Sequence, residues 1–225
     1  EAYAMLADAP SRTVFKNICN YKLSGKVEYL QAIATERVED IQTLLNPGAR
    51  ETYMDLGAYN GDTVKEFLEI TGGQYERIIA FEPDTKNFKK LAAWQLSSGL
   101  TNVEIVNKGI WSGAGTLHFN NDGARSSAID TTGKFCIAVE GVDNFLACRP
   151  VSLIKMDVEG AEQQALDGAR TTLGRYRPKL FVACYHREED LFELPFKIRE
   201  LNDSYRIYLR KHPYIPAWEL NLFAV

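Results

Sequence analysis

Two acidic residues and a histidine follow two apolar runs in the second half of the chain. Asp157 and Glu159 come directly after the run VSLIKM, and His186 comes directly after the run KLFVACY. An imidazole with an ordinary pKa of ~6.5 can accept the proton of a hydroxyl group, and a neighbouring carboxylate can assist it. Asp157, Glu159 and His186 are therefore the candidate catalytic residues.

The same residues offer a second chemistry, which is the binding of a divalent cation. Asp157 and His186, with Glu159 helping, could hold an ion that binds and acidifies a hydroxyl group. Carboxylate oxygens suit Mg²⁺ or Mn²⁺, whereas a histidine ligand shifts the preference toward Mn²⁺ or Zn²⁺. We favour proton transfer by His186, and the cation stays open as the alternative. Glu162 lies in the first turn of the following helix, where we expect it to act as a capping residue.

A glycine-containing turn and an acidic residue in the first half of the chain indicate a binding site for a nucleoside. Gly57 and Gly61 bracket the turn in DLGAYNGDT, so a ligand can approach backbone N–H groups at the start of a helix. Glu82 follows Gly57 by 25 residues and ends the apolar run RIIAF. An acidic residue at about this distance binds the ribose hydroxyls in dinucleotide folds.

Strands and helices alternate along most of the chain, which predicts a mostly parallel sheet with helices on both faces. The carboxyl ends of such strands share one edge, where ligands bind. Two closing strands, SYRIYLRK and AWELNLFAV, are expected to be antiparallel. The expected strands are 51–57, 77–83, 102–110, 115–119, 134–141, 151–160 and 179–186, and the expected helices are 61–70, 84–98, 161–174 and 190–202.

The first 50 residues differ from the rest. Apolar residues at three- and four-residue spacings predict one amphipathic helix over 27–45, which Pro47 and Gly48 end. We therefore divide the chain into an N-terminal helical extension, 1–50, and an α/β domain, 51–225. The extension is expected to pack over the cleft and to contribute to acceptor specificity, or to join the domain to an upstream segment.

Several of these strings resemble one known family. DLGAYNGDT, FEPD, KGIWSGAGTLHF and IKMDVEGAE match the motif order of the FkbM family of S-adenosylmethionine-dependent methyltransferases over roughly residues 50–225. The resemblance implies a Rossmann-like class I methyltransferase fold with a seven-stranded sheet. It also implies that S-adenosylmethionine is the cofactor.

The resemblance also assigns roles around the cofactor. Glu82 would hold the ribose, and Asp55 would anchor the turn or the ammonium group. The family's usual aspartate in the turn is Asn60 here, which keeps a polar group but removes a charge. The methionine-side turn would consist of Asp55, Gly57, Ala58 and Gly61, and Lys108, Gly109 and Ile110 would lie against the adenine.

The function predicted from these residues is methyl transfer to the oxygen of a sugar or other secondary hydroxyl on a glycan, glycolipid or natural product. One alternative is an NAD(P)-dependent oxidoreductase, but Tyr59 stands where the pyrophosphate needs a glycine, and the third glycine is absent. Another alternative is a non-catalytic Rossmann-like module that binds a nucleoside.

The composition of the whole chain limits which binding partners and which cellular location are expected. The net charge of −4 argues against nucleic acid. Because no apolar run approaches the ~20 residues of a membrane span and the N-terminus lacks a signal-peptide pattern, we expect a cytoplasmic protein without a transmembrane segment. The four scattered cysteines are expected to be free thiols. Lys155 interrupts a buried run and needs a buried carboxylate partner, and Ser126 and Ser127 lie where a lid is expected.

Overall fold

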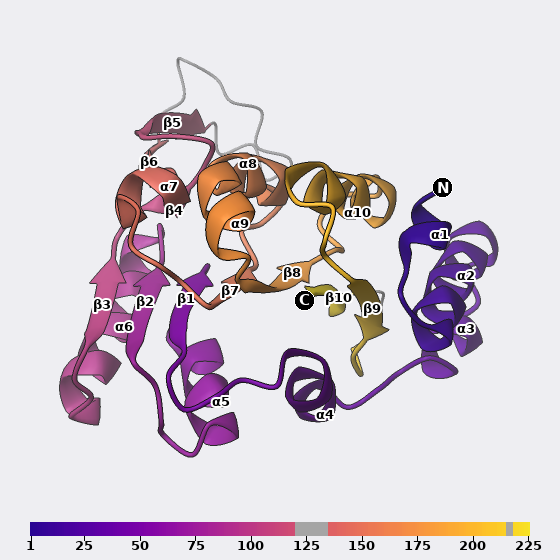
Figure 1. Cartoon of the computed structure of the whole chain (residues 1–225), viewed down its shortest axis with the longest axis horizontal. Coiled ribbons are helices and arrows are strands. Elements are labelled where there is room, and N and C mark those ends of the chain that lie inside the picture. Colours follow the sequence, from indigo (N-terminus) through magenta and orange to yellow (C-terminus); the bar gives the residue numbers. More distant parts are fainter. Residues whose placement is uncertain (120–134, 215–217) are drawn as a thin grey trace.

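A computed structural model describes residues 1–119, 135–214 and 218–225. In this part of the chain a main sheet of seven strands has the order β3-β2-β1-β7-β8-β10-β9, and a small sheet of three strands has the order β4-β6-β5 (Figure 1). The main sheet consists of β1 (Thr52–Leu56), β2 (Arg77–Phe81), β3 (Val103–Val106), β7 (Leu153–Met156), β8 (Lys179–Ala183), β9 (Ile207–Lys211) and β10 (Leu220–Ala224).

Among these described strands, β10 alone runs in the opposite direction, since it is antiparallel to both β8 and β9. The other pairings are parallel. The carboxyl ends of β1, β2, β7 and β8 therefore lie along one edge. This arrangement confirms the predicted Rossmann-like fold and the antiparallel closing pair.

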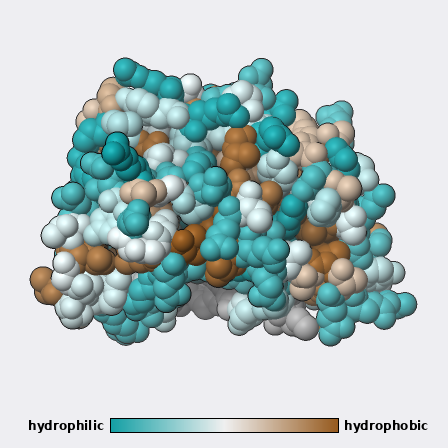
Figure 2. Space-filling view, turned by 60° about the horizontal axis from the view of Figure 1, so that its bottom comes forward, coloured by the Kyte–Doolittle hydropathy of each residue, from teal (hydrophilic) through white to brown (hydrophobic). Residues whose placement is uncertain are grey.

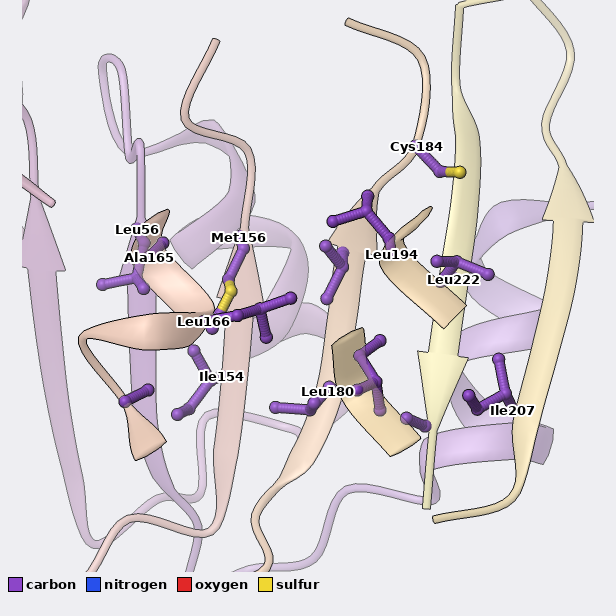
Figure 3. Close-up of a cluster of buried hydrophobic side chains, with 14 of the residues drawn as sticks. Leu56, Ile154, Met156, Ala165, Leu166, Leu180, Cys184, Leu194, Ile207 and Leu222 are labelled. Atoms are coloured by element: carbon purple, nitrogen blue, oxygen red, sulfur yellow. The ribbon is translucent and has the colours of Figure 1, made fainter. Parts of the chain in front are cut away.

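Each face of the main sheet is covered by helices. Alternate strand residues point to opposite faces, so the strands contribute apolar side chains to a separate core cluster on each face. Tyr53 belongs to the core cluster formed with α5 (Asp62–Ile70) and α6 (Thr85–Ser98), and its neighbour Met54 belongs to the cluster on the other face. Figure 3 shows the second cluster, where Ile154, Met156 and Leu180 meet Leu166 and Leu194 of the covering helices. The helices on this face are α7 (Val142–Leu146), α8 (Glu162–Asp167), α9 (Arg170–Tyr176) and α10 (Asp190–Leu201).

Two predicted elements are divided in the structure. The helix expected over 161–174 is interrupted at Gly168, where a Cβ would lie 2.1 Å from the backbone oxygen of Trp111. The strand expected over 102–110 leaves the main sheet after Val106, and β4 (Gly109–Ile110) pairs with β6 (Phe135–Glu140) instead. The strands expected over 115–119 and 134–141 are confirmed as β5 (Gly115–Phe119) and β6, which pair in the antiparallel direction. Ser126 and Ser127 lie outside the described residues.

The prediction of one helix over 27–45 is wrong. The segment contains α3 (Glu28–Gln31), α4 (Arg37–Asp40) and a π-helix over Ile41–Leu45. Between α3 and α4 the chain pairs with the main sheet: Ala34 forms a bridge with Lys211, and Thr35 N donates to Lys211 O at 2.9 Å. A contact with a strand near the other end of the chain therefore interrupts the local helical pattern.

The N-terminal extension covers the outer edge of β9. Ala7 N donates to Ile207 O at 2.8 Å, and Ser11 Oγ accepts from Leu209 N at 3.0 Å. Ser11 lies in α2 (Ala9–Ser24), which follows α1 (Ala2–Met5). Figure 1 shows α1, α2 and α3 beside β9. The polar backbone groups of an edge strand, which would otherwise pair with another chain, thus have intramolecular partners.

The face of the molecule in Figure 2 is mostly hydrophilic, and its hydrophobic residues form small groups between hydrophilic ones. None of the helices within the described ranges is both long and apolar enough to cross a bilayer.

Candidate active site

The turn from β1 to α5, residues 57–61, is held very close to β7. Gly57 has φ +88°, and a Cβ at this position would lie 1.9 Å from the backbone oxygen of Asp157. Gly61 has φ +87°, and its Cβ would lie 2.8 Å from the Trp94 ring. The N–H groups of Gly57 and Ala58 both donate to Phe81 O, at 3.0 and 2.8 Å. Both glycines are therefore required by space and by backbone conformation.

Asp55 lies beneath this turn with no exposed surface. Thr63 Oγ1 donates a hydrogen bond to Asp55 Oδ2, and Lys155 Nζ lies 3.2 Å from Asp55 Oδ1. The predicted carboxylate partner of Lys155 is thus Asp55. In this position the carboxylate anchors the turn from below, which is one of the two roles expected for it.

Glu82 connects the ends of β1 and β2. Its Oε2 accepts from Tyr59 N and its Oε1 accepts from Asp84 N, both at 2.8 Å. The side chain is 6% exposed, and this burial raises the pKa of Glu82 above its ordinary value although the two backbone N–H groups oppose the shift. Each carboxylate oxygen keeps a second lone pair for a ligand hydroxyl.

The segment expected to lie against the adenine adjoins Glu82. Asn107 Nδ2 donates to Glu82 O at 2.8 Å, and a Cβ on Gly109 would lie 3.7 Å from Pro83 Cβ. Lys108 Nζ forms an ion pair with Glu140 Oε2 at 2.9 Å, and Ile110 is buried. Glu82 and residues 108–110 therefore form one continuous wall beyond β2.

On the other side of the turn, His186 lies among carboxylates. Its Nδ1 is 2.9 Å from Glu162 Oε1, and its Nε2 is 3.4 Å from Asp157 Oδ1 and 3.7 Å from Glu159 Oε2. Tyr185 OH donates to both oxygens of Asp157, at 3.2 and 3.3 Å. The structure thus brings the three predicted catalytic residues together, with Glu159 88% exposed at the rim.

Glu162 is a member of this cluster that sequence reasoning assigned only to capping. Its side chain is 1% exposed and reaches back from the first residue of α8, so that Oε1 accepts from Val158 N at 3.1 Å and Gly160 N at 3.4 Å as well as from His186. The helix-start position supplied a local explanation for the carboxylate. A buried carboxylate needs several hydrogen-bond donors. The burial of Glu162 is therefore the property that could have indicated its contact with His186.

The charges around His186 change its protonation. Burial lowers the pKa of His186, but the hydrogen bond and charge of Glu162 and the charges of Asp157 and Glu159 outweigh burial and raise it above the ordinary value. Burial also raises the pKa of Asp190, to about 6, and the charge of Glu162 adds to this effect. His186 therefore holds its proton more tightly than a free imidazole does.

Two further features bear on ligands. Asp157, Glu162 and His186 each offer one ligand atom, and these atoms lie within 4.8 Å of one another. Beneath the turn, a cavity of about 20 Å³ lined in part by Thr63 and Lys155 has room for about one water molecule. This cavity is far too small for a nucleoside.

Comparison with known proteins assigns the family. The model of the methyltransferase FkbM domain matches residues 55–216, and the chain belongs to this family. A search of curated proteins found no significant match.

Several solved structures share the fold of this chain. Methyltransferase FkbM from Methylobacillus flagellatus KT is 25% identical, with a TM-score of 0.84 over 100% of this chain, and the chain spans 57% of that protein's length. A putative methyltransferase from Streptococcus mutans in complex with SAH is 13% identical, with a TM-score of 0.51 over 78% of this chain and 88% of the other. Fibrillarin from Aeropyrum pernix with bound S-adenosylmethionine is 13% identical, with a TM-score of 0.52 over 84% and 73%.

Proposed function

We propose that this chain transfers a methyl group from S-adenosylmethionine to oxygen, on a sugar or other secondary hydroxyl of a glycan, glycolipid or natural product. The observation that carries the proposal is the contact between the turn at Gly57 and the backbone of Asp157. Through this contact, a wall suited to a nucleoside and a histidine suited to proton transfer adjoin each other at neighbouring strand ends.

The residues of the donor side fit the proposed cofactor. Glu82 has free lone pairs for two ribose hydroxyls, and the glycines at positive φ let the turn pack against Asp157 O and the Trp94 ring beside Glu82. Asn60 Oδ1, in the same turn, is buried and lacks a hydrogen-bond partner within the described residues, which leaves an acceptor for the ammonium group. Family membership supports the same donor, and two proteins that share the fold were solved with SAH or S-adenosylmethionine.

When bound, S-adenosylmethionine supplies a methyl group on a sulfonium that is already activated for displacement. His186 and its partners then need only orient the acceptor and remove its proton. With Nδ1–H donating to Glu162, the Nε2 of a neutral His186 is an acceptor and takes the hydroxyl proton as the new carbon–oxygen bond forms. Asp157, 3.4 Å from Nε2, stabilises the resulting imidazolium.

A divalent cation, Mg²⁺ or Mn²⁺, at Asp157 and His186 is the second candidate for activating the hydroxyl. The short separation of the ligand atoms favours it. However, Glu162 Oε1 already accepts from two N–H groups and from His186, so this ligand atom has hydrogen-bond partners without an ion, whereas Glu162 Oε2 is buried without a hydrogen-bond partner within the described residues. We expect turnover to survive dialysis against EDTA. A loss that Mg²⁺ or Mn²⁺ restores would make the cation the better explanation.

The charge of the acceptor side supports a neutral acceptor. Glu159 is exposed beside His186, Asp157 and Glu162 are also close to its ring, and the whole chain carries a net charge of −4. A phosphate backbone would be repelled there, so we propose a small-molecule or glycan partner and no nucleic acid. All four cysteines are free thiols, which supports a reducing compartment, and we propose the cytoplasm.

Thermal denaturation with S-adenosylmethionine, S-adenosylhomocysteine or NADH tests the donor. At a hundredfold excess over its dissociation constant, a true ligand adds ~2.7 kcal/mol to stability. We expect both adenosyl compounds to stabilise the protein, whereas stabilisation by NADH alone would favour an oxidoreductase.

Replacing Glu82 tests the ribose assignment in the same assay. Glu82→Ala should abolish the stabilisation by S-adenosylhomocysteine, because it removes the carboxylate that is proposed to hold the ribose. No other described carboxylate occupies this position between Tyr59 N and Asp84 N. Glu104→Ala is the matched control, since Glu104 lies on the outer strand β3 and pairs with Arg77 of β2. An undiminished shift in Glu82→Ala would remove the ribose assignment.

A further inference from the structure

Lys155 is a buried cation between the two halves of the site. It lies within β7, where its backbone is paired with Asp55 on β1 and with Phe181 on β8. The residue is 4% exposed. A buried ammonium group is costly unless it is paired and hydrogen-bonded, so its partners are expected to have a definite role.

On the donor side, the ammonium group of Lys155 holds both ends of the glycine turn. Its Nζ donates to Gly57 O at 2.8 Å, at the start of the turn. It also lies 3.2 Å from Asp55 Oδ1, and the other oxygen of Asp55 accepts from Thr63 in the first turn of α5. Removing this one cation would therefore release the carbonyl of Gly57 and leave Asp55 as an unpaired buried charge.

On the acceptor side, Lys155 is followed two residues later by Asp157, which faces His186. Asp157 N donates to Leu56 O at 2.9 Å, so the backbone that carries Asp157 is pinned to the start of the same turn.

We propose that Lys155 is a positioning residue that fixes the donor turn against the strand end bearing Asp157, and so holds the cofactor in line with the acceptor. The inference rests on the proposed function. Lys155 touches neither the acceptor nor His186, and it acts through Gly57 and Asp55. In-line displacement depends strongly on such alignment, because a displacement of about 1 Å can cost about a hundredfold in rate.

The test measures the affinity for S-adenosylhomocysteine by calorimetry in the wild type, Lys155→Met and Lys179→Met. Lys179 is the matched control, because it pairs with the buried carboxylate of Glu51 at 2.6 Å at the opposite end of the sheet. Both variants leave a buried carboxylate unpaired and should lower Tm. Only Lys155→Met should weaken S-adenosylhomocysteine binding, by about ten- to a hundredfold, because the turn loses a hydrogen bond to a charged group.

A double variant separates positioning from folding. Asp55→Asn combined with Lys155→Met removes both charges, so it should recover Tm relative to Lys155→Met while the affinity stays low. If the wild type binds S-adenosylhomocysteine and the double variant binds it equally well, the positioning role is overturned. If the wild type itself does not bind S-adenosylhomocysteine, the proposed function fails first.

Discussion

At the scale of single residues, the arrangement of His186 separates two tasks between its ring nitrogens. Glu162 is buried and holds Nδ1, whereas Nε2 faces Asp157 and the exposed Glu159. The neighbouring carboxylates raise the pKa of His186 above its ordinary value, so a larger fraction is protonated near neutral pH. Since only the neutral imidazole can accept a proton, only part of the His186 population can act as the base near neutral pH.

This protonation predicts the pH dependence of methyl transfer. In the wild type, kcat/KM should rise with pH through a pKa above the ordinary ~6.5 of histidine. Glu162→Gln removes the strongest of the interactions that raise the pKa, so the rising limb should move to lower pH. Glu188→Gln, whose side chain is 91% exposed, is the control and should leave the limb in place. An unmoved limb in Glu162→Gln would contradict the pairing.

Removal of the imidazole is a separate prediction. His186→Ala should lower kcat by about 10²–10⁴, the usual contribution of a general base, with an unchanged affinity for S-adenosylhomocysteine. Steady-state kinetics with any accepted hydroxyl compound would measure the first quantity, and calorimetry the second. Full turnover in His186→Ala would eliminate the proton-transfer role.

At this scale the sequence was most informative where strand ends carry the chemistry. Asp157, Glu159 and His186 converge because parallel strands end at one edge. The contact between Glu162 and His186 was not predicted. It requires the side chain of Glu162 to turn back toward Gly160 N, and residue spacing does not encode this direction.

At the scale of elements, contact with β7 restricts the residue type at Gly57, in the turn between β1 and α5, more than the backbone conformation does. Gly57 and Gly99 both have positive φ, at +88° and +68°. A Cβ on Gly57 would collide with Asp157 O, whereas a Cβ on Gly99 would meet nothing within 4 Å. The pair therefore separates steric exclusion from conformational strain.

Alanine at these two positions should have different costs. Gly99→Ala should lower the free energy of unfolding by about 1–2 kcal/mol, the cost of a left-handed residue. Gly57→Ala should cost more, about 2–4 kcal/mol, because strand β7 must also shift. Urea unfolding of both variants measures the difference, and equal losses would show that β7 yields freely at Asp157.

Long-range contacts explain why some predicted elements failed. The apolar spacing over 27–45 is helical, but the pairing of Ala34 with Lys211 in β9 interrupts the helix. The expected helix over 161–174 also divides at Gly168, where the backbone of Trp111 leaves no room for a side chain. The spacing of apolar residues identifies where helices form, and tertiary contacts such as these divide a predicted helix into shorter ones.

At the scale of the whole molecule, the N-terminal extension completes the main sheet. Ser11 is buried, and its Oγ accepts from Leu209 N at 3.0 Å and from Arg210 Nη1 at 2.8 Å. Arg210 in turn pairs with Asp8 and Asp40 of the extension. We therefore expect residues 1–50 and 51–225 to unfold in a single transition.

Replacing this serine tests the closure of the edge. Ser11→Ala should destabilise the protein by about 1–3 kcal/mol, because it leaves Leu209 N buried without its acceptor, whereas Arg210 Nη1 still donates to Leu209 O at 3.0 Å. Ser24→Ala, at the exposed end of the same helix, should stay within about 0.5 kcal/mol of the wild type. If urea midpoints and slopes are equal in both variants, the extension does not stabilise β9.

The bridge between Leu6 and Ile207 also sets the order of events during folding. These residues are about 200 positions apart, so at a synthesis rate of roughly 5–20 residues per second the ribosome delivers the second about 10–40 s after the first. During that interval, the amphipathic segment that will cover β9 has no strand to cover. Closure of the sheet is thus a late step with high contact order, and the nascent extension is exposed to chaperones until β9 has emerged.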